Sequence, residues 1–171
     1  LICKEAGKPH NYSKGEIARC LLTLNLAKEE ATRFEGEKVP IDFGLGTGKT
    51  AYTKPFPIGP ILAISPFNFP LNLVMHKVAP ALAAGCPVIL KPSPFTPLTS
   101  LAFGELVDKA GFPPGSLNVL VCKDSEAESL VRDERLKALS FTGSPKVGWF
   151  LKTIAGMKKV ILELGGNAAV I

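Results

Sequence analysis

The chain has 171 residues, 46% of them apolar and 20% charged, which is enough hydrophobic material for one domain with a sizeable core and excludes intrinsic disorder. Twenty Lys and Arg residues against 15 Asp and Glu residues give a formal net charge of +5, a mildly basic balance that favours anionic ligands. The basic residues are scattered, so we predict no nucleic-acid partner.

The first part of the chain predicts a helix and then a hairpin. Ile17, Leu21 and Leu24 recur with the helical period within residues 14–35, which predicts an amphipathic helix. Within residues 38–54, the segments KVPIDF and TAYTK surround GLGTG. This pattern predicts two short strands joined by a glycine turn.

The segment GTGKT at residues 46–50 looks like the end of a phosphate-binding P-loop. That motif requires a glycine five residues before Gly48, where Phe43 stands, and it must open a helix. Pro55 and Pro57 follow too closely for a helix to form. We therefore predict a hairpin turn here and no nucleoside triphosphate site.

The middle of the chain is nearly free of charge, since residues 55–104 carry only Lys77 and Lys91. Residues 55–76 have no charge at all, but they contain five prolines and two asparagines. A membrane-spanning helix is therefore excluded, and we predict no membrane association. We interpret this stretch as the interior of an α/β domain, in which a lone lysine and a lone asparagine require an explanation.

From residue 61 onward, apolar strands alternate with helices. The strands are predicted at 61–65, 86–91, 116–122, 136–141 and 158–164, the helices at 71–84, 98–110, 125–132 and 145–155, and residues 168–171 are a candidate for the start of another strand. Uniformly apolar strands in this alternation are typical of a parallel, doubly wound sheet covered on both faces. Ligands of such sheets bind beyond the carboxyl ends of the strands. This rule selects residues 65–70, 91–97, 142–144 and 163–166.

Two polar residues of the charge-poor stretch fall at this edge. Asn68 lies between Phe67 and Phe69, in a loop that we expect to be rigid and water-poor, with the amide aimed at a developing oxyanion. The alternative is an Asx turn that caps the following helix. Lys91 ends an apolar strand, where its ammonium is able to hydrogen-bond ribose hydroxyls or phosphate, unless it simply reaches solvent.

The segment TGSPKVG at residues 142–148 follows a strand and is expected to open a helix, with Ser144 as N-cap and Pro145 as first residue. The free amides and the helix dipole at this point attract phosphate. The alternative is a capped helix that binds nothing.

Glu163 is a carboxylate in the apolar strand VILEL, immediately before Gly-Gly. A carboxyl group in apolar surroundings has a raised pKa and is suited to general-base catalysis. The alternative is a salt bridge to Lys158 or Lys159.

Four cysteines, Cys3, Cys20, Cys86 and Cys122, have no metal-ligand spacing, and only two histidines are present, so we predict no metal site. A disulfide framework is not expected in so long and apolar a chain, which favours a reducing, cytoplasmic location. We interpret all four cysteines as packing residues.

Five segments, in this order, resemble the aldehyde dehydrogenase superfamily. They are ISPFNFPLNL (64–73), HKVAPALAAGCPVILKPSPFTPL (76–98), AGFPPGSLNVL (110–120), SFTGSPKVG (140–148) and KKVILELGGN (158–167). The run GEIARCLLTLNLAKEEA and the end KKVILELGGNAAVI are most similar to the lactaldehyde dehydrogenase-like and non-phosphorylating glyceraldehyde-3-phosphate dehydrogenase branch.

The resemblance implies oxidation of a small-molecule aldehyde to a carboxylic acid, with NAD or NADP as cofactor, through a thiohemiacetal and an acyl-enzyme. Asn68 matches the asparagine that holds the oxyanion, Glu163 the glutamate that activates water, and Lys91 the lysine that contacts the adenine ribose. The family's nucleophilic cysteine lies beyond the position of Ile171. We therefore expect a cofactor-binding fragment that is inactive alone.

The resemblance also implies a set of cofactor-binding residues. These are Ile64, Ser65, Pro66, Phe67, Asn68, Lys91, Ser93, Pro94, Phe141, Thr142, Gly143, Ser144, Val147, Glu163, Leu164 and Gly165. Many NAD-preferring members have a glutamate that grips the ribose diol where this chain has Pro94. Without that carboxylate, Lys91 and Ser93 are able to receive a 2′-phosphate, so we predict that NADP is tolerated beside NAD.

By the same resemblance, residues 1–37 are an N-terminal helical segment packing on the cofactor domain, residues 38–56 a bridging hairpin for oligomerisation, and residues 57–171 a truncated, Rossmann-like NAD(P)-binding domain. The full-length protein is expected to be a homo-oligomer, a dimer or tetramer. Two alternatives stay open. One is a CoA-acylating aldehyde dehydrogenase, a class that generally lacks the base glutamate, and the other is a non-catalytic nucleotide-binding module.

Overall fold

A computed structural model describes residues 1–169 of the chain. It contains five parallel strands in the order β5-β4-β3-β6-β7. They are β3 (Ile61–Ile64), β4 (Val88–Lys91), β5 (Leu117–Val119), β6 (Ala138–Thr142) and β7 (Lys159–Glu163). The chain starts in the middle at β3, winds outward to β5, and returns to build the other half. The predicted doubly wound α/β fold is confirmed, and its switch point lies between β3 and β6.

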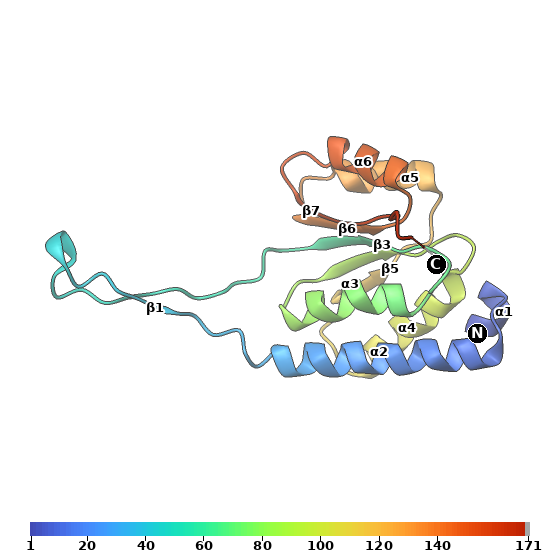
Figure 1. Ribbon diagram of the computed structural model, residues 1–171, viewed down its shortest axis with the longest axis horizontal. Helices are drawn as coiled ribbons and strands as arrows, with labels where there is room; N and C mark the ends of the chain where they lie inside the picture. Colours follow the sequence, from blue (N-terminus) through green and yellow to red (C-terminus); the bar gives the residue numbers. More distant parts are fainter. Residues whose placement is uncertain (170–171) are drawn as a thin grey trace.

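Helices cover both faces of this sheet (Figure 1). They are α3 (Asn72–Ala83) and α4 (Pro97–Lys109) on one face, and α5 (Asp124–Arg132) and α6 (Pro145–Ile154) on the other. Alternate residues of β3 feed the two cores: Leu62 packs with Leu139 and Leu151, whereas Ala63 packs with Val74. This alternation explains why the central strands are apolar along their whole length.

The edge strand β7 departs from the expected uniform burial. Its residues alternate between exposed and half-buried, and Ile161 is 63% exposed. The strand lies beside β6 alone, and α3 contacts β3 and β4 instead. One face of β7 is therefore open at the point where Glu163 ends the strand.

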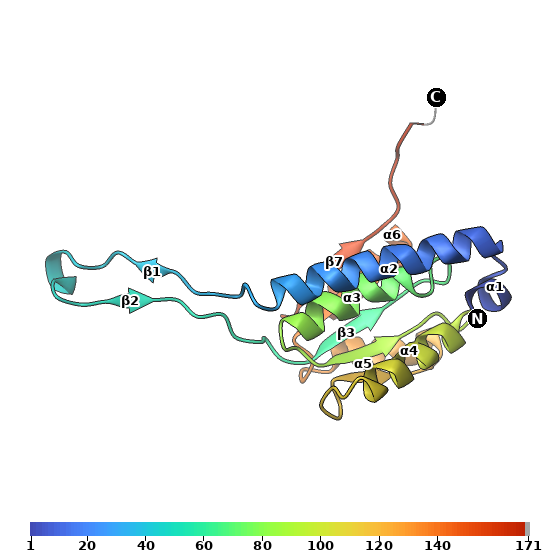
Figure 2. The ribbon, with the colours of Figure 1, turned by 90° about the horizontal axis from the view of Figure 1, so that it is seen from below.

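Two further helices, α1 (Ile2–Ala6) and α2 (His10–Glu30), precede the sheet, and α2 packs along α3 (Figure 2). The helix predicted over residues 14–35 thus begins earlier, at His10 directly after Pro9, and it also ends earlier, at Glu30. The expected packing face is wrong. Ile17, Leu21 and Leu24 are 45%, 56% and 37% exposed, whereas the buried residues of α2 are Ser13, Glu16 and Cys20.

A buried carboxylate explains why α2 packs through this other face. Glu16 Oε1 accepts hydrogen bonds from the backbone N–H groups of Leu71 (2.8 Å) and Asn72 (3.0 Å), and its Oε2 pairs with Lys8 Nζ at 2.7 Å. These amides at the start of α3 have no partner within their own helix. Charge-assisted bonds to them outweigh the burial of a few apolar side chains, and they anchor the loop that carries Asn68 to α2.

The predicted hairpin is confirmed. Strands β1 (Lys38–Val39) and β2 (Ala51–Tyr52) pair antiparallel around the 3₁₀ turn η1 (Gly44–Gly46). The hairpin extends away from the sheet as a long arm (Figure 1 and Figure 2). The Gly-Lys-Thr sequence at residues 48–50 leads into β2 and not into a helix.

The described residues contain neither a membrane-spanning helix nor a strand after β7. Among residues 1–169, no helix has the length and apolar character required to cross a bilayer. In the segment predicted to start another strand, Ala168 and Ala169 are not in a strand, and residues 170–171 lie outside the described part.

Candidate functional site

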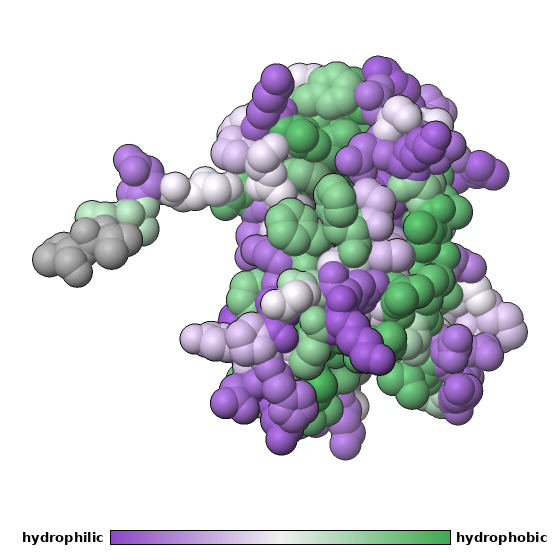
Figure 3. Space-filling model, turned by 90° about the vertical axis from the view of Figure 1, so that its right-hand side faces the viewer, coloured by the Kyte–Doolittle hydropathy of each residue, from purple (hydrophilic) through white to green (hydrophobic). Residues whose placement is uncertain are grey.

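Polar groups gather at the carboxyl edge of the sheet, where Lys91 ends β4, Thr142 ends β6 and Glu163 ends β7. Figure 3 shows the molecule from this side, with hydrophobic side chains lying between hydrophilic ones. A cavity of about 270 Å³ opens here, across the switch point between β3 and β6. This is the location at which doubly wound sheets bind ligands.

Twelve of the sixteen predicted cofactor residues line this cavity together. They are Ile64, Ser65, Pro66, Phe67, Lys91, Ser93, Pro94, Phe141, Thr142, Gly143, Ser144 and Val147. Asn68, Glu163, Leu164 and Gly165 are not among its lining residues. Four further lining residues are not in the predicted cofactor set: Phe95, Asp124, Ala127 and Leu151.

The turn into α6 has the predicted geometry. Ser144 is the N-cap, its Oγ accepts the Val147 N–H at 3.4 Å, and Pro145 is the first helical residue. A Cβ on Gly143 would lie 2.5 Å from Cζ of Phe141, so only glycine lets this turn pass so close to the ring. The start of α6, where the helix dipole is positive, lines the cavity through Ser144 and Val147, and this favours an anion.

Lys91 does not reach solvent. Its side chain is only 2% exposed, and its Nζ lies 2.7 Å from Oδ1 of Asp124, at the start of α5. Asp124 itself is 85% exposed. The lysine charge is therefore neutralised by a carboxylate 33 positions away in the chain, a pairing that no local pattern indicates.

Asn68 lies in the predicted loop, but the loop is not water-poor. Asn68 is exposed and Phe67 is 56% exposed. The Asx-turn alternative also fails, because the N-cap of α3 is Leu71 and the first amides of this helix are bound by the Glu16 carboxylate instead. The Phe67 ring meets Phe95 edge-on, with ring centroids 6.0 Å apart, so an aromatic contact supports the loop.

Glu163 is held by a hydroxyl. Its Oε2 accepts a hydrogen bond from Thr142 Oγ1 at 2.8 Å, and Thr142 Oγ1 in turn accepts one from Lys77 Nζ at 2.6 Å. Contrary to expectation, the carboxylate is exposed, and in the described part of the chain it forms no ion pair with Lys158 or Lys159. The Thr142 bond instead fixes the orientation of the carboxylate on the open face of β7.

Lys77 contacts this group of residues although it is not among the predicted site residues, and its isolation in a charge-poor stretch was a signal. It is only 7% exposed on α3, and its Nζ also donates to Ser140 Oγ at 3.3 Å. Burial lowers the pKa of Lys77 to about 8, against the opposing effect of the Glu163 carboxylate. The buried Lys77 ammonium therefore lies in a chain of hydrogen bonds that leads through Thr142 to Glu163.

This low pKa predicts a pH-dependent stability. The pKa of Lys77 is about 8 in the folded protein and 10.5 for an ordinary lysine, as in the unfolded chain. Between these two pH values the unfolded chain therefore holds one more proton than the folded protein. Cys20, whose pKa is raised from 9.0 to about 12, has the opposite effect above pH 9. The free energy of unfolding should therefore rise with pH between about 8 and 9, by up to about 1.4 kcal/mol per pH unit. In Lys77→Met this slope should be absent, whereas the exposed-site control Lys28→Met should keep it, as urea unfolding at several pH values measures. Identical profiles for wild type and Lys77→Met would contradict the assignment.

The cysteines have the character of packing residues. Burial, together with the Glu16 carboxylate, raises the pKa of the Cys20 thiol to about 12, and burial raises the pKa of Cys122. A thiol with a raised pKa is a poor nucleophile at neutral pH. Among residues 1–169, no three His, Cys, Asp or Glu side chains are clustered as metal ligands.

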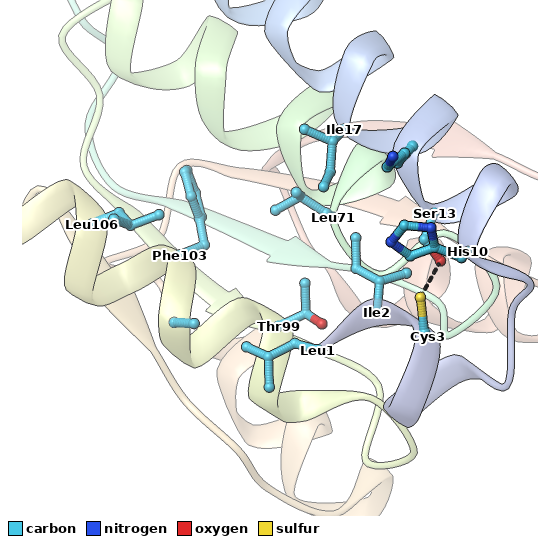
Figure 4. Close-up of a pocket in the computed structure, with 12 residues that line it drawn as sticks. Leu1, Ile2, Cys3, His10, Ser13, Ile17, Leu71, Thr99, Phe103 and Leu106 are labelled. Carbon is cyan, nitrogen blue, oxygen red and sulfur yellow. Dashed lines mark hydrogen bonds between the residues drawn. The ribbon is translucent and has the colours of Figure 1, made fainter.

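A second cavity of about 350 Å³ lies between α1, α2 and α4 (Figure 4). Its lining is largely apolar and includes Ile2, Ile17, Leu71, Phe103 and Leu106. None of the predicted catalytic or cofactor residues lines it. We therefore place the candidate site at the carboxyl edge of the sheet alone.

Comparison with solved structures supports this architecture. Aldehyde dehydrogenase 21 from Physcomitrella patens, in complex with the reaction product succinate, matches with a TM-score of 0.92 and 46% identity, over 98% of this chain and 35% of that one. The glyceraldehyde-3-phosphate dehydrogenase GapN from Methanocaldococcus jannaschii, complexed with NADP, matches with a TM-score of 0.87 and 35% identity, over 96% of this chain and 37% of that one.

Comparison of sequences leads to the same family. The 3-sulfolactaldehyde dehydrogenase of Priestia aryabhattai is 44% identical over 173 residues, which cover 100% of this chain and 36% of that protein. The chain thus spans about a third of the length of such relatives. The aldehyde dehydrogenase family matches residues 1–171. Because the family matches the whole chain and the fold agrees with solved members, this chain belongs to the aldehyde dehydrogenase family.

Proposed function

We propose that this chain is the cofactor-binding portion of an NAD(P)-dependent aldehyde dehydrogenase that oxidises an aldehyde to a carboxylic acid. The observation that carries the proposal is the single cavity at the switch point of the sheet, lined by twelve of the residues expected to bind the cofactor. Since the chain spans about a third of its relatives, we assign the activity to a longer protein that includes it.

The residues present fit a nicotinamide dinucleotide. The capped start of α6 and the close turn at Gly143 suit a pyrophosphate, and Lys91 lies in the same cavity as a partner for a ribose. The related GapN from Methanocaldococcus jannaschii was solved with NADP. NAD or NADP supplies the hydride acceptor when it is bound.

The chain's own residues divide the remaining work. The Asn68 amide donates a hydrogen bond to the oxyanion that forms when the aldehyde is attacked. Glu163 takes a proton from the water that hydrolyses the acyl-enzyme, and Thr142 holds its carboxylate in place. Lys77 positions Thr142. The attacking cysteine belongs to the part of the longer protein after residue 171.

Glu163 favours this hydrolytic reaction over the CoA-acylating alternative. A base that activates water has a use only if water is the final acceptor of the acyl group. The carboxylate is exposed on the open face of β7 and is oriented by Thr142, an arrangement suited to a water molecule. The non-catalytic alternative gives no role to this arrangement.

We also propose how the chain is organised in the longer protein. Residues 1–37 pack on the cofactor domain formed by residues 57–171, and the arm of residues 38–56 bridges copies in a dimer or tetramer. The arm supports this role because its Phe43, Tyr52 and Phe56 side chains are 72%, 76% and 74% exposed.

The setting and the branch of the family are proposals as well. All four cysteines are free, which supports a reducing, cytoplasmic location. The 3-sulfolactaldehyde dehydrogenase relative supports the lactaldehyde dehydrogenase-like branch. The substrate is a small-molecule aldehyde, and we propose no nucleic-acid or membrane partner.

The test is a comparison of the 171-residue chain with the full-length enzyme. NADH and NADPH titrations, followed by nicotinamide fluorescence, should show binding to the full-length enzyme, which should also reduce NAD or NADP when an aldehyde is added. The 171-residue chain should show no thiol-dependent turnover. Turnover by the chain alone, or a full-length enzyme that never reduces cofactor with any aldehyde of a broad panel, would refute the proposal.

A further inference from the structure

The cavity at the switch point contains one opposite pair of charges. Among its lining residues in the described part of the chain, only Lys91 and Asp124 are charged. Their side chains meet at 2.7 Å, with Lys91 almost fully buried and Asp124 largely exposed. Besides Asp124, the Lys91 ammonium has one further contact, the Pro92 carbonyl at 3.5 Å. The lysine that is placed to meet a ribose is thus already occupied by a carboxylate.

The fold places Asp124 here specifically. Strand β5 lies beside β4 with Val119 opposite Leu90, so the chain that leaves β5 enters α5 next to the end of β4. The other acidic residue in the first turn of α5, Glu126, is used locally, since its Oε2 accepts the Lys123 backbone N–H at 2.8 Å. Asp124 alone is directed to Lys91, and its exposure leaves room for it to accept further hydrogen bonds.

A carboxylate and a phosphate make opposite demands on such a site. A carboxylate accepts hydrogen bonds from the 2′- and 3′-hydroxyls of an unmodified ribose, the usual way in which dinucleotide sites select NAD. A 2′-phosphate carries negative charge and needs a cation that is not already paired. Position 94 lacks a carboxylate, which favours NADP, but Asp124 supplies one from a different element.

We propose that Asp124 determines the cofactor selectivity of this enzyme in favour of NAD. It accepts hydrogen bonds from the ribose diol of NAD, and it disfavours NADP both by repelling the 2′-phosphate and by neutralising Lys91. This inference rests on the proposed function, because it takes the cavity to be the NAD(P) site. It revises the expectation, drawn from Pro94 together with Lys91 and Ser93, that NADP is tolerated beside NAD.

The test is Asp124→Asn in the full-length enzyme, with the dissociation constants of NADH and NADPH measured separately by nicotinamide fluorescence. The substitution keeps the size of the side chain and removes its charge at an exposed position, so folding should be preserved, and a thermal melt checks this. The NADPH affinity should rise relative to NADH by at least about tenfold, which corresponds to about 1.4 kcal/mol. Adding Lys91→Met to Asp124→Asn should abolish most of this gain, because the freed ammonium is then missing.

Glu128→Gln is the matched control. It removes the same charge from α5 outside the cavity, and it should leave the NADPH to NADH ratio unchanged. An unchanged ratio in Asp124→Asn, or an equal change in Glu128→Gln, would overturn the role of Asp124 while the cofactor site stands. If the wild-type enzyme binds neither reduced cofactor, the proposed function and this inference fall together.

Discussion

Replacing Glu163 with glutamine in the full-length enzyme should stop turnover after one cycle. The amide keeps the shape of the side chain and is still able to accept the Thr142 hydrogen bond, but it cannot take a proton from water. Loss of a general base lowers the rate by about a hundred- to ten-thousandfold. Acylation precedes this step, so we expect a rapid burst of about one equivalent of NAD(P)H per site and then almost no steady state, as stopped-flow absorbance measures.

The matched control is Lys159→Gln, which changes the charge on the same exposed face of β7 without touching the Thr142 contact. It should keep the steady-state rate within a few fold. Loss of the burst in Glu163→Gln would mean that Glu163 acts before or during acylation. An unaltered steady-state rate would remove Glu163 from the mechanism.

Asn68→Ala should reduce the acylation step rather than deacylation. Removing one donor of an oxyanion site reduces kcat by about a hundred- to a thousandfold. Asn68 is exposed and does not line the cofactor cavity, so the affinity for NADH should change little and the melting temperature should stay close to that of wild type. In contrast to Glu163→Gln, this variant should show no burst, because formation of NAD(P)H itself becomes slow.

Asn25→Ala, the same change at an exposed position on α2, is the control and should behave as wild type. The decisive measurement is the single-turnover rate of NAD(P)H formation with excess enzyme. If Asn68→Ala forms NAD(P)H as fast as wild type, another group stabilises the oxyanion. The two variants together then separate the roles of the loop after β3 and the end of β7.

The helix α2 illustrates the limit of periodicity. The helical repeat of Ile17, Leu21 and Leu24 correctly predicts a helix, because repeat and secondary structure are both local properties. The face that packs is a different matter. It is selected by Glu16, whose partners Leu71 and Asn72 lie more than 50 positions away, and hydrogen bonds to unpaired helix amides decide against the apolar stripe.

The candidate site likewise combines residues that local patterns identify with contacts that only the fold creates. Asn68, Lys91, Ser144 and Glu163 are identifiable because each lies at or just beyond the carboxyl end of a predicted strand, where doubly wound sheets bind ligands. The groups that tune them are not identifiable in this way. Lys77 lies among apolar residues on the buried side of α3, and only the fold directs its ammonium to Thr142 and thus to Glu163.

The sequence by itself determined the alternation of strands and helices from residue 61 onward and the hairpin, and it pointed to the edge at which the candidate site lies, because all of these follow from short-range patterns and a general rule of parallel sheets. Only the tertiary structure decided which charges meet. The pair Lys91–Asp124 and the chain from Lys77 to Glu163 join residues on different elements, so they exist only once the sheet and its helices have been packed.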